Sequence, residues 1–254
     1  MKISVVTVTY NSAKTLGDTI ESVQKQDYRD VEHVIIDGAS RDGTVDIIRS
    51  YDSIVNWKSE PDLGLYDAIN KGILASSGDV VGILNSDDFF PDHGVLGRIV
   101  EAFRDPNVDA VIGDIAFVKP DNLKRIVRHY SAKSFHPGKF ADGYMPPHPS
   151  FYVRREFYEK LGLYKLDYKI AADYELLIRF LKTNSLRYKY IPGIMVYMRT
   201  GGVSNQSIKS RYLLNKETVK ACAENGIHTN MARLSLKYFT KVFEYLTPLF
   251  KRGQ

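Results

Sequence analysis

Residues 80–88 read Val-Val-Gly-Ile-Leu-Asn-Ser-Asp-Asp: an apolar strand, a two-residue turn, and two adjacent carboxylates, Asp87 and Asp88. Open α/β sheets bind their ligands at the carboxyl ends of buried strands, and these side chains follow such a strand. Neighbouring carboxylates repel each other, and a divalent cation or a hydroxyl-rich ligand between them relieves the repulsion. The same residues also suit a helix cap or a turn before Pro91. The rest of the chain decides between these roles.

Apolar β-branched runs alternate with helical periodicity through the first part of the chain. The pattern predicts strands at 2–8, 32–36, 55–58, 80–84 and 110–112, with helices at 16–23, 44–48, 65–74 and 95–103. Such alternation is typical of an α/β fold with a mostly parallel sheet and helices on both faces. Further on, the segments 115–118 and 124–128 predict a hairpin, and 150–153, 188–191 and 194–197 predict further strands, between and after helices at 155–161 and 173–181. In this part of the chain a small antiparallel sheet is expected. Helices are then expected at 207–225 and 232–246.

Composition and charge limit the class of protein. Apolar residues make up 44% of the chain and charged residues 26%, which is typical of a soluble globular protein. We find no signal peptide and no apolar run of bilayer length. The lone cysteine, Cys222, cannot form an internal disulfide, which favours a reducing compartment.

The positive charge is concentrated in one part of the chain. Nine Lys/Arg and three Glu give residues 206–254 a charge of +6, which leaves −1 for residues 1–205. A nucleic-acid binder would have a basic body, so no nucleic-acid partner is expected. A basic tail favours an anionic surface such as a membrane.

Polar side chains follow several of the predicted strands. The sequence Thr-Tyr-Asn at 9–11 ends the first strand, and Asp37 ends the second. Glu60 and Asp62 follow the third strand, and Asp87 and Asp88 follow the fourth. In a parallel sheet these groups gather on one rim. Other sites are not supported: the dinucleotide fingerprint is missing, and a threonine, Thr44, stands where a phosphate loop needs lysine. The histidines and the cysteine show no zinc spacing.

Five ordered motifs carry a resemblance to a known family. They are Val-Thr-Tyr-Asn at 8–11, Asp-Gly-Ala-Ser-Arg-Asp-Gly-Thr at 37–44, Asp-Ala-Ile-Asn-Lys-Gly at 67–72, Asn-Ser-Asp-Asp at 85–88 and Ala-Asp-Tyr-Glu-Leu at 172–176. Over residues 1–205 the chain resembles a family 2 glycosyltransferase of the GT-A fold, and most of all the bacterial enzymes of O-antigen and capsule synthesis. The resemblance implies a nucleotide-sugar half at 1–113, an acceptor half at 114–205 and a basic amphipathic helical tail at 206–254.

The resemblance also implies a donor site. Its nucleotide-sugar-binding positions are Thr9, Tyr10, Asn11, Asp37, Asp67, Lys71, Asn85 and Asp87, and Asp88 is the position that coordinates Mn²⁺ or Mg²⁺. In the family the aspartate at position 37 accepts from the uracil N–H, which implies a uridine nucleotide. Two alternatives stay open: Asp37 can stabilise the Gly38 turn, and Asp67 with Lys71, four residues apart, can form a surface ion pair. Many relatives have aspartate in place of Asn85.

Asp173 is the position of the general base in the resemblance. Inverting transfer needs one carboxylate that accepts the proton of the attacking hydroxyl. Asp173 also suits a helix N-cap, and Glu175 is a rival base. His148 is a candidate contact for the acceptor or the diphosphate, and Arg199 for phosphate on a mobile loop; an ordinary loop histidine and a solvated arginine are the alternatives.

The end of the chain carries one apolar stripe. It consists of Leu236, Phe239, Phe243, Leu246 and Phe250, beside a basic face. Such a helix can lie in a membrane interface. Docking on the core or on a partner subunit, as in a homodimer, is the alternative.

Together these features predict an inverting, metal-dependent hexosyltransferase. It would use a UDP-sugar and a lipid-diphosphate-linked glycan acceptor, and it would lie in the cytoplasm, peripheral on the inner face of the cell membrane. A sugar nucleotidyltransferase and a catalytically inactive nucleotide-sugar binding module are the alternatives.

Overall fold

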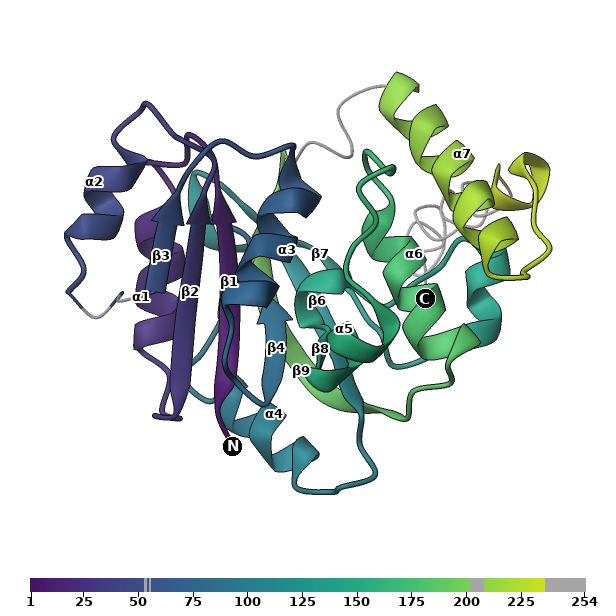
Figure 1. The fold of residues 1–254 in the computed structure, drawn as a ribbon, viewed down its shortest axis with the longest axis horizontal. Coiled ribbons are helices and arrows are strands. Elements are labelled where there is room, and N and C mark those ends of the chain that lie inside the picture. The colour runs from purple at the N-terminus through teal and green to yellow at the C-terminus, as the bar shows by residue number, and fades with distance from the viewer. Residues whose placement is uncertain (53, 55, 202–207, 236–254) are drawn as a thin grey trace, which may run out of the picture.

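A computed structural model of the chain describes residues 1–52, 54, 56–201 and 208–235 (Figure 1). The strands are β1 (Ile3–Thr9), β2 (Val31–Asp37), β3 (Asn56–Ser59), β4 (Val80–Ile83), β5 (Asp88–Phe89), β6 (Ala110–Lys119), β7 (Asn122–Tyr130), β8 (Tyr152–Arg154) and β9 (Tyr188–Arg199). The α-helices are α1 (Leu16–Gln24), α2 (Thr44–Arg49), α3 (Leu65–Ala75), α4 (Val95–Phe103), α5 (Glu156–Leu161), α6 (Ala172–Ile178) and α7 (Ile208–Glu224).

In the described part of the chain the strands form one nine-stranded sheet. Its order is β3-β2-β1-β4-β8-β6-β9-β5, and β7 pairs with the outer part of β6. The β3-β2-β1-β4 half is parallel, and so is the β6–β9 pair. The antiparallel strands β5, β7 and β8 join the same sheet. The predicted α/β class with a mostly parallel sheet is confirmed.

Helices cover both faces of the sheet, and successive buried side chains of a strand point to opposite faces. Val6 of β1 belongs to the cluster that α3 covers, whereas its neighbour Val5 belongs to the cluster that α4 covers. In β2, Val34 packs on the α3 side and Ile35 on the side of α1 and α2. This period of two is what a strand buried on both faces requires.

A glycine seats α3 against the sheet. A Cβ on Gly72 would lie 2.3 Å from Cγ1 of Val6, a distance that real contacts do not reach. The missing side chain therefore lets α3 approach β1 closely. Because α3 also carries Asp67 and Lys71, this contact fixes both side chains relative to the strand ends.

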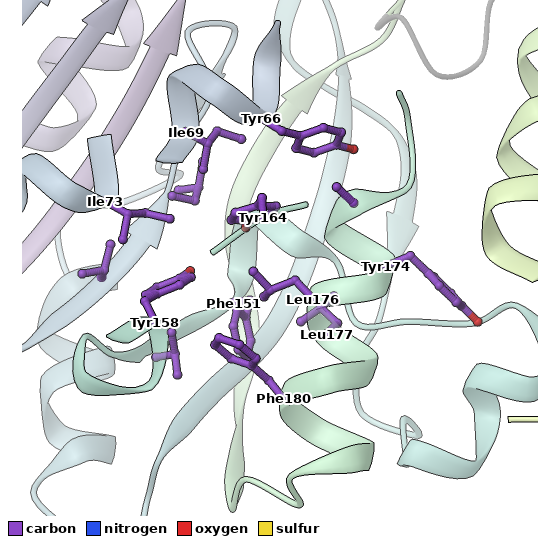
Figure 2. Packing of buried hydrophobic residues seen from close by; sticks show 14 of the residues in the cluster. Tyr66, Ile69, Ile73, Phe151, Tyr158, Tyr164, Tyr174, Leu176, Leu177 and Phe180 are labelled. Carbon is purple, nitrogen blue, oxygen red and sulfur yellow. The ribbon is translucent and has the colours of Figure 1, made fainter. Parts of the chain in front are cut away.

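The region around α6 is packed with aromatic rings (Figure 2). Tyr66 of α3 stacks on Tyr164 with ring centroids 5.7 Å apart, and Phe151 packs against Phe180 at 6.4 Å. In Figure 1, α6 and α7 lie beyond the sheet on the side opposite α2. The helix α7 packs on α6 and adds Cys222 to this cluster, where the thiol is fully buried. Among the described residues, no helix combines the length and the apolar character that a bilayer span requires.

Two strands run further than the sequence pattern predicts. Where the pattern gives separate strands at 188–191 and 194–197, β9 is continuous, with Gly193 at a φ of 96°. The pairing jumps there from Gly113–Ile191 to Asp114–Ile194, so residues 192 and 193 form a bulge. The pattern also left residues 113 and 114 between two predicted strands, whereas β6 is continuous there and shows the same shift in its pairing with β9. The stripe from 236 to 250 lies outside the described residues.

Candidate active site

The turn after β1 is fastened to the turn after β2. Asn11 adopts a left-handed φ of 50°, which asparagine tolerates better than most residues. Its N–H donates to Oγ of Ser40 at 2.7 Å, and its Oδ1 accepts from the N–H of Arg41 at 2.9 Å. The ring of Tyr10 is 67% exposed, whereas Oγ1 of Thr9 is buried without a partner among the described residues. The end of β1 therefore offers an exposed ring and an unpaired hydroxyl.

Asp37, at the end of β2, is fully buried. Its carboxylate accepts from the N–H and the Oγ of Ser40 at 3.0 and 2.5 Å, and from Oγ of Ser59 at 2.6 Å. A carboxylate has about four acceptor positions, so most of them are used inside the protein. Asp37 thus stabilises its turn, the alternative that the sequence left open, and its uracil contact stays a prediction.

Asp62 is a residue to which the sequence assigned no role. A Cβ built on Gly38 would lie 2.5 Å from Oδ2 of Asp62 and 3.3 Å from Cδ2 of Tyr10. The absence of a side chain on Gly38 therefore lets a half-buried carboxylate and an exposed ring both approach its backbone. Its position after β3, on the same rim as the other carboxylates, was the available signal.

Lys71 lies in a small charge network on α3. Its Nζ is 3.1 Å from Asp67, 3.2 Å from Glu60 and 3.1 Å from the carbonyl of Pro61. Asp67 also accepts from the N–H of Leu63 at 3.0 Å, and this bond, with Lys71, lowers the pKa of Asp67. The predicted ion pair between Asp67 and Lys71 is therefore present. Both side chains also bind the segment after β3, through Glu60, Pro61 and Leu63.

The turn between β4 and β5 contains unpaired buried oxygens. Asp88 is 1% exposed, and its Oδ1 has no partner among the described residues. Its other oxygen accepts only a long 3.4 Å contact from Asn85, whose own Oδ1 is also buried and unpaired. Burial, and then the charge of Asp87, raise the pKa of Asp88 well above its usual value. A cation at this carboxylate would remove that penalty.

Arg199 lies at the end of β9 and is engaged within the protein. Its Nη1 donates to the carbonyl of Asp87 at 2.6 Å, its Nη2 forms an ion pair with Asp18, and its guanidinium lies 5.0 Å from the ring of Phe89. Only 9% of the residue is exposed. These contacts tie β9 and α1 to the turn between β4 and β5, so Arg199 supports that turn, and its phosphate contact stays a prediction.

Asp173 is the second residue of α6 and lies beside a histidine. The N-cap of α6 is Ala171, so the alternative role of Asp173 as N-cap is wrong. Nδ1 of His148 is 3.3 Å from Oδ2 of Asp173, and Oδ1 accepts the N–H of Tyr174 at 2.8 Å. Burial raises the pKa of Asp173, and His148 opposes that shift. A carboxylate with a raised pKa and an adjacent imidazole is suited to accept a proton near neutral pH.

Glu175 has a different environment. It is fully buried, 2.8 Å from Nη2 of Arg179 and 3.0 Å from Nζ of Lys165. Burial alone would raise the pKa of Glu175, but the two cations outweigh it and the pKa is lowered. This carboxylate is committed to structure, which favours Asp173 over the rival base.

Glu217 of α7 is a supporting residue that the sequence analysis missed. Its carboxylate accepts the three successive N–H groups of residues 169–171, each at 2.9 Å. On the other side, Tyr66 donates to the carbonyl of Ile170 at 2.5 Å. The turn that leads into Asp173 is therefore held by α7 and α3. No local signal marks a glutamate that acts across 46–48 residues of sequence.

The predicted residues thus form two groups. The ends of β1, β2 and β4 are joined by the contacts above and by a 2.9 Å hydrogen bond from Ser86 to Ser12. The Asp173–His148 pair forms the second group. Tyr66 links it to α3, one residue from Asp67.

Comparison with known proteins identifies the family. Residues 4–162 match the family model described as Glycosyl transferase family 2. The chain is a family 2 glycosyltransferase. The predictions of family and of enzyme class are therefore confirmed, and the glycosyltransferase match leaves the sugar nucleotidyltransferase alternative without support.

Relatives of this glycosyltransferase occur in mycobacteria. It is 34% identical, over 181 residues, to an uncharacterized glycosyltransferase of Mycobacterium tuberculosis, covering 70% of this chain and 68% of that one. It is 26% identical over 217 residues to a PGL/p-HBAD biosynthesis glycosyltransferase of Mycobacterium bovis, covering 83% and 82%.

Solved structures show the same fold. Residues 1–349 of S. aureus TarS, in complex with UDP-GlcNAc, match with a TM-score of 0.67 at 19% identity, covering 87% of this chain and 66% of that one. In a longer TarS chain the match spans 39%. The mannosyltransferase PcManGT from Pyrobaculum calidifontis, in complex with GDP-Man and Mn²⁺, matches with a TM-score of 0.60 at 18% identity, covering 97% and 81%.

The residues of this glycosyltransferase fit a divalent cation at Asp88. Within the described ranges, no three His, Cys, Asp or Glu side chains cluster into a closed metal cage. Mg²⁺-type sites in nucleotide-dependent enzymes need only one or two carboxylates, because substrate phosphates and water complete the coordination. The unpaired Oδ1 of Asp88 is an oxygen donor of that kind.

Proposed function

We propose that this glycosyltransferase transfers a hexose, with inversion, from a UDP-sugar to a hydroxyl of a lipid-diphosphate-linked glycan, as in O-antigen or capsule synthesis. The observation that carries the proposal is the set of buried, unpaired oxygens of Thr9, Asn85 and Asp88 at the ends of β1 and β4. Buried polar atoms without partners are costly, and a polar ligand at this rim would supply the partners.

In this proposal the donor lies along the rim. The exposed ring of Tyr10 and the carboxylate of Asp62 bind the nucleoside, Asp87 the ribose, and Lys71 the diphosphate. Asp88 would hold Mn²⁺ or Mg²⁺, which when bound neutralises charge on the departing nucleotide. TarS in complex with UDP-GlcNAc supports a uridine donor, and PcManGT in complex with Mn²⁺ supports the metal.

Asp173 performs the proton step. Its carboxylate accepts the proton of the acceptor hydroxyl as that oxygen attacks the anomeric carbon. The bond from this carbon to the diphosphate breaks on the opposite face, and UDP leaves with the electron pair. His148 opposes the rise that burial causes in the pKa of Asp173, and Glu217 holds the turn that presents this carboxylate.

We also propose a cytoplasmic location on the inner face of the membrane, where a lipid-linked acceptor is found. The charge of +6 over residues 206–254 supports this location.

The test is a thermal-shift panel of UDP- and GDP-sugars with and without Mn²⁺, followed by transfer assays of Asp173→Asn. A UDP-sugar at one hundred times its Kd should stabilise the protein by about 2.7 kcal/mol. Asp173→Asn should keep this shift while transfer falls about 10²–10⁴-fold. Stabilisation by GDP-sugars alone would reject the uridine assignment, and normal turnover of the variant would reject the base. A chain that binds UDP-sugars without any transfer would instead be the inactive binding module.

A further inference from the structure

The hairpin of β6 and β7, together with the segment that follows it, carries unpaired positive charge. Residues 119–139 contain six Lys/Arg and one Asp, although residues 1–205 as a whole have a charge of −1. None of the six forms an ion pair within the described part of the chain; they are Lys119, Lys124, Arg125, Arg128, Lys133 and Lys139. Unpaired cations beside one another raise the local positive potential, which attracts an anionic ligand.

A cavity of about 560 Å³ lies between β7 and the segment 131–145. Its lining combines the cationic or basic side chains of Arg128, His129 and Lys139 with the rings of Tyr130 and Phe135, and no Asp or Glu lines it. The size suits a drug-sized ligand, and the lining suits an anion attached to an apolar group.

The positive side of the cavity is held in place. The guanidinium of Arg128 lies 4.5 Å from the ring centroid of Phe117 and 5.9 Å from that of Tyr130. Nε2 of His129 is 3.0 Å from Oδ2 of the buried Asp114. Preorganised donors of this kind lose little conformational entropy on binding.

The cavity wall continues into the residues around Asp173. Tyr130 donates to the carbonyl of Met145 at 2.6 Å, and Met145 stands three residues before His148. On the other side Phe135 packs on Phe140, whose carbonyl accepts from the hydroxyl of Tyr174. In Figure 2, Tyr174 projects from α6 away from the neighbouring core leucines. A ligand anchored in the cavity would therefore border the segment that presents the base.

We infer that this cavity binds the phosphate end of the acceptor, a phosphate or diphosphate ester on an apolar chain. The inference rests on the proposed function, since it assigns a place to the acceptor of that reaction. The plainer explanation is that cations on β7 protect an exposed edge strand from pairing. That explanation covers Lys124 and Arg125, but not Lys139, which lies beyond the strand and lines the cavity.

Calorimetric titration with geranyl diphosphate, in the presence of saturating UDP and Mn²⁺, tests the inference. The variant is Lys139→Gln, whose lysine contacts Oγ of Ser134 at 3.1 Å, and the matched control is Lys182→Gln, an exposed lysine on another surface. Loss of one charge-assisted contact should weaken binding about tenfold in the variant and not in the control. Arg128→Gln provides a second variant with the same expected result.

The arms of the experiment separate the outcomes. Inorganic pyrophosphate should bind more weakly than geranyl diphosphate, because the rings of the cavity contact the chain; equal binding would reject the apolar part. Absence of geranyl diphosphate binding, or equal binding to wild type and both variants, would overturn the inference. UDP affinity, measured alone in each protein, reports on the donor site. If wild type did not bind UDP, that result would count against the proposed function and not against the binding of geranyl diphosphate in the cavity.

Discussion

Replacement of Asp88 by asparagine should stabilise the ligand-free protein and remove its response to metal and nucleotide. The side chain is 1% exposed, its Oδ1 has no partner, and its Oδ2 has one contact at 3.4 Å. Asparagine has nearly the same shape; it removes the charge and puts an NH2 group in place of one carboxylate oxygen. The backbone carbonyl at this position, which accepts from Thr19 at 2.7 Å, keeps its hydrogen bond.

The size of the effect follows from the penalty for an unsatisfied buried group. That penalty is about 1–3 kcal/mol, and more when the group is charged. In a chain of this length each kcal/mol shifts Tm by about 2–4 °C, so ligand-free Asp88→Asn should melt about 2–12 °C higher at pH 7.

The sign is set by the raised pKa of Asp88. The folded state binds this proton more tightly than the unfolded state, so stability falls as pH rises above the unfolded pKa of about 4. Asparagine does not titrate, so its contribution to the free energy of unfolding does not change with pH. The advantage of the variant should therefore be largest at neutral pH and should disappear below about pH 4.

Thermal melts from pH 4 to pH 8, with and without Mn²⁺ and UDP, measure both effects. Wild type should gain about 2.7 kcal/mol from ligand at one hundred times its Kd, and the variant much less. The control is Asp114→Asn, since Asp114 is also buried but accepts from Ser131 and from the N–H of Ala132. That variant should lose stability. A ligand-free Asp88→Asn that melts below wild type, or that responds fully to Mn²⁺ and UDP, would refute the reasoning.

Two further predictions concern the base and its support. His148→Gln should move the acidic limb of the kcat/KM profile to higher pH, because His148 lowers the pKa of Asp173 and the base is active only when ionised; an unchanged limb would contradict the contact. Glu217→Ala leaves three N–H groups without an acceptor and should cost about 2–5 kcal/mol, seen as a lower Tm, with a lower kcat and unchanged UDP affinity, whereas Glu217→Gln should lose less. Normal kcat in a folded Glu217→Ala would show that the turn does not depend on α7.

Much of the fold could be predicted because local patterns encode it. The alternation of Val5 and Val6 between two clusters is the same signal in sequence and structure. The break at Pro192–Gly193 misled the prediction, because a bulge continues a strand through residues that usually end one. Arg199, next to a glycine pair, looked like part of a mobile loop. It belongs instead to β9, because pairing with β6 extends the strand to its end.

The site was predicted less completely for a physical reason. A carboxylate that follows a buried strand, such as Asp88, is marked by its neighbours in sequence. Glu217 acts through contacts that only the folded chain creates, and Lys139 likewise comes to line the cavity only in the folded chain. Asp37 is an intermediate case: its donor Ser40 stands in the same motif, whereas its other hydroxyl donor, Ser59 of β3, could not be read from that motif.

The hydrogen bonds from the turn before Asp173 to Glu217 of α7 bear on how segments of related enzymes can be joined into chimeras. The family match ends at residue 162, so Asp173, the proposed proton acceptor, and Glu217, which holds the turn before it, both lie downstream of the matched segment. A chimera that exchanges everything after residue 205 would retain the strand ends of β1, β2 and β4 yet lose the Glu217 carboxylate that holds the turn before Asp173. Shuffled variants should therefore be joined after α7, or should carry a compatible acid at position 217.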